Sequence, residues 1–152
     1  MTDKLPPIHV TRTFEASRDE VFRAFTDPSA IPLWLGGQHP GDTTRVVELD
    51  LRMGGRYVFQ GTLQGKAWEV HGTYREVAIP EKLVYTWLDS SDGHPPSAES
   101  LVTVEFREIG GRTEVKVTHA NDATESSRRS HEGGWNECFD ALARVVMERR
   151  QG

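Results

Sequence analysis

The sequence contains a single cysteine, Cys138, among 152 residues. One cysteine excludes an intramolecular disulfide bond, and a low cysteine content is typical of proteins in a reducing compartment. The chain also lacks any apolar run of about eighteen residues, the length that a membrane-spanning helix needs. Its first ten residues, MTDKLPPIHV, lack the apolar stretch of a secretory signal. We therefore expect a cytoplasmic protein without a membrane span.

Excess positive charge and the common motifs of cofactor chemistry are missing as well. The 18 lysines and arginines are outnumbered by 23 aspartates and glutamates, so nucleic acid is not expected as a partner. The glycine pairs stand outside any Walker, GxGxxG or GxSxG pattern. No HxxxH or CxxC spacing accompanies the histidines, and we expect neither a metal nor a cofactor. The histidines are His9, His39, His71, His94, His119 and His131.

Alternation of apolar and polar residues dominates positions 43–120. This period of two predicts six consecutive antiparallel strands joined by short turns: TRVVELDL, GRYVFQGTL, KAWEVHGTYREV, EKLVYTWLD, SLVTVEFRE and RTEVKVTHA. The breaks fall at Met53-Gly54-Gly55, Gly65, Ile79-Pro80-Glu81, the Asp92–Pro96 loop and Gly110-Gly111. The face predicted to be buried carries Tyr57, Phe59, Trp68, Val70, Leu83, Tyr85, Trp87, Val102, Val104, Phe106, Val115 and Val117. The opposite face is predicted to carry Arg56, Glu69, Thr73, Glu105, Glu114 and Lys116.

One further strand and two short helices are predicted before this meander. Residues 8–15, IHVTRTFE, alternate like a strand. Ser17 and Glu20 match a capping box, and a helix after them has an apolar face. Asp27-Pro28 predicts the start of a second, short helix that leads to Trp34 and Leu35 and ends at Gly36-Gly37.

A long helix is predicted from about 123 to 149, capped by Asp122 with Glu125 three residues later. Its apolar stripe is Trp135, Cys138, Phe139, Leu142, Val145 and Val146. Gly133-Gly134 interrupt it, although each glycine inside a helix costs roughly 1 kcal/mol relative to alanine. We interpret the pair as allowing the helix to approach a curved sheet closely while Trp135 wedges in beside it. A kink or a helix start at the glycines is the alternative.

Together these elements predict one α+β domain over residues 1–152, with its core at about 8–149. A seven-stranded antiparallel sheet with one apolar face and one long helix must curve around that helix. Two short helices follow the first strand.

Three segments resemble a known family. VELDLRMGGRYVF (47–59), EKLVYTW (81–87) and HEGGWNECFDAL (131–142) are similar to the heat-shock protein 90 ATPase activator homologue family. That family belongs to the START-related, birch-pollen-allergen-like (SRPBCC) superfamily, and the resemblance extends over about residues 9–148. It implies the helix-grip fold, in which a curved sheet grips the C-terminal helix around a hydrophobic cavity. This chain departs from many relatives at Pro32 and at Ala120-Asn121-Asp122.

Ten residues are candidates for binding a ligand in such a cavity. Aromatic side chains on the inner face either line a pocket or fill a core, and buried Tyr and Trp need hydrogen-bond partners. The two histidines either contact a ligand or act as acid or base, unless backbone carbonyls satisfy them. The thiol either lines the pocket or is a small core residue. The candidates are Trp34, Tyr57, Phe59, Trp68, Tyr85, Trp87, His119, His131, Trp135 and Cys138.

We expect the protein to bind a small hydrophobic molecule, such as a lipid, an aromatic metabolite or a polyketide-like compound. Two alternatives remain open. One is an enzyme of the cyclase, dehydratase or hydrolase type that uses cavity histidines, and the other is an interaction module that stimulates a chaperone ATPase. The oligomeric state is expected to be a monomer or a homodimer.

Overall fold

A single curved sheet of seven antiparallel strands forms the body of the protein. The computed structural model describes residues 5–36, 39–91 and 98–151. The predicted Asp92–Pro96 loop, His94 and Gly37 lie outside these residues. The strands are β1 (Ile8–Phe14), β2 (Thr43–Leu49), β3 (Arg56–Leu63), β4 (Lys66–Ala78), β5 (Lys82–Ser91), β6 (Ser100–Ile109) and β7 (Arg112–Ala120).

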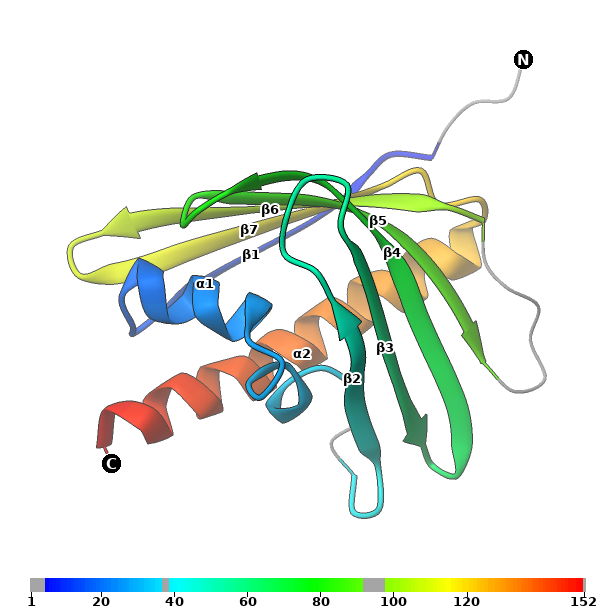
Figure 1. The fold of residues 1–152 in the computed structure, drawn as a ribbon, viewed down its shortest axis with the longest axis horizontal. Helices are drawn as coiled ribbons and strands as arrows, with labels where there is room; N and C mark the ends of the chain where they lie inside the picture. Colours follow the sequence, from blue (N-terminus) through cyan, green and yellow to red (C-terminus); the bar gives the residue numbers. More distant parts are fainter. Residues whose placement is uncertain (1–4, 37–38, 92–97, 152) are drawn as a thin grey trace.

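The predicted meander is confirmed. The strand order is β1-β7-β6-β5-β4-β3-β2, so β2 to β7 pair in sequence and β1 adds to the far edge beside β7. Of the residues predicted to face inward, all are buried except Trp68, which is half-buried. The predicted outer residues are exposed or half-buried. Figure 1 shows the sheet curving, with both α-helices on its concave side.

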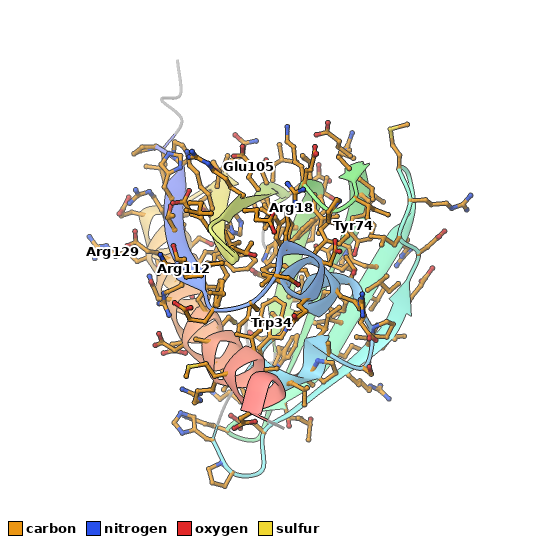
Figure 2. All side chains as sticks on the ribbon, turned by 90° about the vertical axis from the view of Figure 1, so that its left-hand side faces the viewer. Arg18, Trp34, Tyr74, Glu105, Arg112 and Arg129 are labelled. Atoms are coloured by element: carbon orange, nitrogen blue, oxygen red, sulfur yellow. The ribbon has the colours of Figure 1, made fainter. Side chains whose placement is uncertain are left out.

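Two short helical segments follow β1, as predicted, and supply part of the core, but the predicted start of the second at Asp27-Pro28 is wrong, because Asp27 ends the first helix. Helix α1 (Arg18–Thr26) begins at Ser17, whose hydroxyl accepts a hydrogen bond from the backbone N–H of Glu20 at 3.3 Å. The second is one 3-10 turn, η1 (Ile31–Leu33). The indole of Trp34 donates to the carbonyl of Ala24 at 2.9 Å and so ties this turn to α1. In Figure 2, Trp34 lies inside the molecule, whereas Glu105 and Arg129 lie at its periphery.

The terminal helix, α2 (Glu125–Gln151), confirms the predicted long helix but not its cap. The backbone N–H of Ser127 donates to the hydroxyl of Thr124 at 3.1 Å, so Thr124 caps the helix. The predicted Asp122–Glu125 capping box is wrong, because the carboxylate of Asp122 bonds to His131 instead. The stripe of α2 buries Trp135, Cys138, Phe139, Leu142 and Val146, and leaves Val145 half-buried.

The interpretation of Gly133-Gly134 as a point of close approach is also wrong. A Cβ atom added at either glycine would meet no other atom within 4 Å, and α2 runs through both without starting there. Close packing requires glycine elsewhere, at Gly36 and Gly61, where an added Cβ would lie 2.9 Å and 2.6 Å from the indole of Trp68. The glycines of α2 therefore border open space. No helix among the described residues is long and apolar enough to cross a membrane.

Candidate functional site

A groove of about 210 Å³ lies beside the N-terminal half of α2. Strands β4 and β5 supply Trp68, Val70 and Trp87, and α2 supplies six of the twelve lining residues. Its surface is mostly apolar, with polar groups at Ser130, His131 and Glu137. The lining residues are Leu35, Gly36, Leu63, Trp68, Val70, Trp87, Ser130, His131, Gly134, Trp135, Glu137 and Cys138.

The space deeper under the helix, where the sequence places a cavity, is packed with aromatic rings. Tyr57 contacts Phe59 and Tyr85, with ring centroids 4.9 Å and 5.4 Å apart, and its hydroxyl donates to the carbonyl of Thr86 at 2.6 Å. The volume left among these rings is about 20 Å³, on the scale of one water molecule. Among the ten candidates, Trp34, Tyr57, Phe59 and Tyr85 line this packed space and not the groove.

Five candidates do come together at the groove: Trp68, Trp87, His131, Trp135 and Cys138. Trp87 and Trp135 separate the groove from the packed interior, since they border both. Cys138 is buried, and burial, with a smaller contribution from Glu137, raises the pKa of its thiol to about 11 against the lowering effect of a bond with the Gly36 backbone. The thiol is therefore protonated at neutral pH and is a poor nucleophile.

His119, the remaining candidate, lies behind the groove wall and is held neutral. The indole N–H of Trp135 donates to its Nδ1 at 3.0 Å, so the ring proton is on Nε2. That proton is donated to the hydroxyl of Ser100 at 2.8 Å, and Ser100 donates in turn to the carbonyl of Trp87 at 3.2 Å. Burial and the charge of His131 lower the pKa of His119 to about 3, despite the opposing effect of Asp89. His119 is fully buried.

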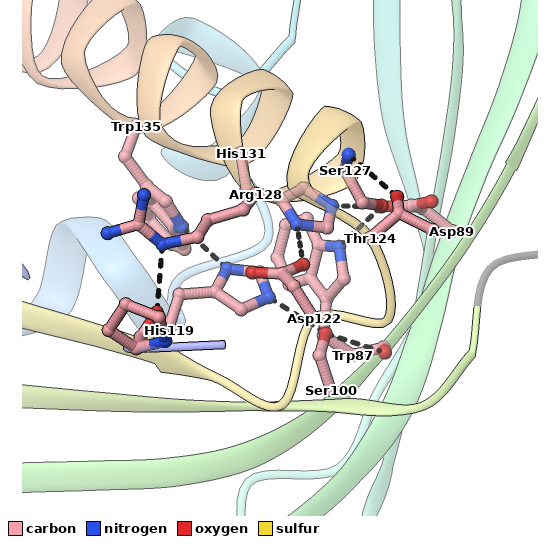
Figure 3. Close-up of polar contacts among 11 residues, drawn as sticks. Trp87, Asp89, Ser100, His119, Asp122, Thr124, Ser127, Arg128, His131 and Trp135 are labelled. Atoms are coloured by element: carbon pink, nitrogen blue, oxygen red, sulfur yellow. Dashed lines mark hydrogen bonds and ion pairs between the residues drawn. The ribbon is translucent and has the colours of Figure 1, made fainter. Parts of the chain in front are cut away.

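His131 has the opposite environment, shown in Figure 3. Its Nδ1 lies 2.6 Å from a carboxylate oxygen of Asp122, and its Nε2 lies 2.6 Å from a carboxylate oxygen of Asp89. Burial lowers the pKa of His131, but the hydrogen bonds and charges of Asp89 and Asp122 outweigh it and raise the pKa above its usual value. His131 is therefore an imidazolium that donates from both nitrogens. The side chain of Asp122 is 3% exposed.

The two imidazole rings stack on each other, with centroids 4.3 Å apart and planes 12° apart. One ring is charged and the other neutral, which avoids like-charge repulsion in this buried contact. Nitrogen atoms of both rings and an oxygen of Asp122 lie within 4.8 Å of one another. Metal ligation requires nitrogen lone pairs that converge on one point, whereas parallel rings direct theirs alongside each other. The nitrogens of His119 and His131 are instead all engaged in hydrogen bonds.

The family model that describes the activator of Hsp90 ATPase homolog 1-like proteins matches residues 15–147. The chain belongs to this family. The AHSA1 protein from Silicibacter pomeroyi has a similar structure, with a TM-score of 0.80 and 20% identity over 94% of this chain and 99% of that one. Protein CV1439 from Chromobacterium violaceum has a TM-score of 0.78 and 24% identity, over 93% and 96% of the two chains. No protein with a curated description matches the chain.

These matches confirm the family resemblance seen in the sequence and the helix-grip-like fold. A further similar structure is CalU16 from Micromonospora echinospora, with a lower TM-score of 0.67 and 25% identity over 95% of this chain and 78% of that one. AHSA1-like membership indicates a ligand-binding fold and does not identify the ligand.

The sequence did not identify two residues of this site, Asp89 and Asp122, as members of it. Asp89 continues the inward alternation of Tyr85 and Trp87 on β5, so its position was a usable signal for a carboxylate at the site. It accepts hydrogen bonds from the indole of Trp87 at 2.8 Å and from His131. Asp122 was assigned to a cap because its spacing to Glu125 matched a capping box.

Asp122→Asn is expected to lower the pKa of His131, because it removes one of the two carboxylates that stabilise the imidazolium. The pKa is measured by NMR titration of the ring protons. Asp19→Asn, which neutralises an exposed carboxylate on α1, is the control and should leave the His131 titration unchanged. An unaltered pKa in Asp122→Asn contradicts the assignment and leaves Asp89 as the group that holds the charge.

Proposed function

We propose that the protein binds a small hydrophobic molecule, such as a lipid, an aromatic metabolite or a polyketide-like compound, in the groove beside α2. The observation that supports this is the groove itself: an apolar recess of about 210 Å³ that the indoles of Trp68, Trp87 and Trp135 line. Apolar recesses with a few polar groups are the usual form of small-molecule sites. His131 is the proposed polar contact at one end.

The volume bears on the size of this ligand. Drug-sized ligands occupy pockets of about 300 Å³ or more, and the groove is smaller than that. A ligand that fills it is therefore a small one, or a larger one that extends into solvent along the exposed Leu63. Leu63 is 44% exposed although it lines the groove, which gives the site an open, apolar rim.

Acid–base catalysis has weaker support than binding. Both nitrogens of His131 already donate to carboxylates, and both nitrogens of His119 have partners. Neither ring can take a proton from a ligand unless one of these bonds breaks. The two alternative functions, an enzyme that uses the histidines and a module that stimulates a chaperone ATPase, stay predictions. We also propose a cytoplasmic location, because a lone cysteine that remains a thiol fits a reducing compartment.

Leu63→Glu is expected to weaken binding about tenfold or more, because it places a charge on the apolar rim that a hydrophobic ligand must cover. Compounds are first extracted from the purified protein and identified by native mass spectrometry, and their affinities are measured by titration calorimetry. Leu33→Glu is the matched control, since Leu33 is 48% exposed and does not line the groove. Equal affinity in wild type and Leu63→Glu contradicts the proposed site.

A further inference from the structure

The glycine at position 134 has no packing role that explains it. A glycine within a helix is unfavourable relative to alanine, and an added Cβ at Gly134 would contact nothing within 4 Å. Gly134 does line the groove, whereas its neighbour Gly133 does not. The backbone of α2 is therefore bare at this one point of the groove wall. A ring can lie against it at van der Waals distance, which a side chain would prevent.

A second wall is an indole held in one place. Gly36 and Gly61 both pack against the ring of Trp68, at distances where an added Cβ would collide with it. Gly36 also has a φ of +95°, which disfavours any side chain there. Trp68 is half-buried and lines the groove together with Gly134. Two surfaces without flexible side chains favour a flat, rigid occupant over a chain with many rotatable bonds, because less conformational entropy is lost.

The volume and the charge of the groove further restrict which ligands can bind there. An apolar cavity of about 150 Å³ accepts benzene, and this groove has about 210 Å³. Among its described lining residues Glu137 carries a negative charge, and lysine and arginine are absent. The positive charge of His131 is offset by Asp89 and Asp122. A ligand that carries a carboxylate would meet like charge.

We infer that the occupant is a planar aromatic molecule of about two fused rings without a negative charge, lying against the bare backbone at Gly134. This inference depends on the proposed function, because it names the ligand class of the same groove. It predicts that shape and charge both discriminate among hydrophobic compounds of similar size. A neutral or cationic two-ring compound binds best, and its carboxylate congener and an aliphatic compound bind more weakly.

The test uses four probes on the full chain by titration calorimetry: 2-naphthol, 1-naphthylmethylamine, 2-naphthoate and 1-decanol. We expect 2-naphthoate to bind about tenfold more weakly than 2-naphthol, from repulsion at the groove. Glu137→Gln should recover much of that loss, so that the ratio of the dissociation constants of 2-naphthoate and 2-naphthol decreases. Glu132→Gln, an exposed glutamate of α2 outside the groove, is the control and should recover nothing.

The glycine pair supplies a matched comparison for shape. Gly134→Ala and Gly133→Ala should each raise the melting temperature by about 2–4 °C, because alanine favours the helix. Gly134→Ala should also weaken 2-naphthol about fivefold, since one added methyl group takes up part of a small site. Gly133→Ala should leave the affinity unchanged. The stability gain confirms that a loss of affinity does not come from unfolding.

The outcomes separate this inference from the proposed function. If 1-decanol or 2-naphthoate binds as tightly as 2-naphthol, or if Gly134→Ala binds like wild type, the ligand class is overturned and the groove remains a binding site. If Leu63→Glu changes no affinity and no probe binds wild type, the proposed function and the inference fail together. Preference for 2-naphthol and for the amine, lost selectively in Gly134→Ala, supports both.

Discussion

Phe139→Ala is expected to lower the free energy of unfolding by about 3–5 kcal/mol. Phe139 is fully buried at the centre of the stripe of α2. Its ring contacts those of Phe14, Phe25 and Trp135, with centroids 5.5, 6.4 and 6.0 Å away. One side chain thus joins the terminal helix to β1 and α1, and truncation leaves a cavity that three rings on different elements cannot easily fill.

The measurement is urea unfolding followed by circular dichroism. Met147→Ala is the control on the same helix, because Met147 is 49% exposed and its removal creates no enclosed cavity. The control should change the free energy of unfolding by less than about 0.5 kcal/mol. A loss in Phe139→Ala no larger than about 1 kcal/mol would mean that the helix packs on the sheet mainly through other contacts.

Much of the fold could be predicted because sheet and helix each impose a period on the sequence. The alternation in EKLVYTWLD places Leu83, Tyr85 and Trp87 on one face, and all three are buried. Phe139 and Leu142, three residues apart, indicate a buried helical stripe in the same way, and both are fully buried. A period shows which way a side chain points, and this is enough to identify the layers of the fold.

The site was less predictable because a period carries no information on volume. Tyr57 and Tyr85 point inward as expected, yet they fill the space they were expected to line. At Gly134 the error is the reverse: a close contact is expected, and the structure has open space. The neighbours of Gly134 in sequence suggest a close contact, but whether a glycine faces a neighbour or open space depends on elements brought together by the fold.

The predicted capping residue of α2 is wrong for a related reason. Both Asp122 and Thr124 are suitable capping residues, and the local pattern favours Asp122 because of Glu125. The structure gives the cap to Thr124 because Asp122 has a stronger partner, the imidazolium of His131, at 2.6 Å. Asp89 on β5 completes that contact from a segment 42 residues away along the chain. Competition of this kind depends on tertiary contacts that a local motif does not record.

The stacked histidines predict an unusual dependence of stability on pH. His119 has an ordinary pKa of about 6.5 when unfolded, and its folded pKa is lowered to about 3. Between these values the unfolded chain binds the proton and the folded protein does not, so the stability from the neutral ring falls as the pH decreases. His131 has a raised folded pKa. Its stabilising contribution is fully present below about pH 6.5 and is lost as the pH rises through the raised value.

The contribution of His119 to the free energy of unfolding therefore decreases below about pH 6.5, and that of His131 decreases above it. His119→Gln isolates the acidic side, because an amide can accept from Trp135 and donate to Ser100 but does not titrate. We expect the stability of wild type relative to His119→Gln to fall by about 2–3 kcal/mol between about pH 6.5 and pH 4.5. The measurement is urea unfolding of both proteins across that range.

His131→Gln tests the basic side, since it removes the ring whose pKa is raised in the folded protein. The stability of wild type relative to His131→Gln should decline as the pH rises above about 6.5. Carboxylic acids are ionised above about pH 6.5 in both proteins, so the decline above that pH isolates His131. A flat difference for His119→Gln across the acidic range would show that His119 takes up a proton when folded. In that case its bond with the indole of Trp135 does not hold the ring neutral, and the separation of charge between the two stacked rings is wrong.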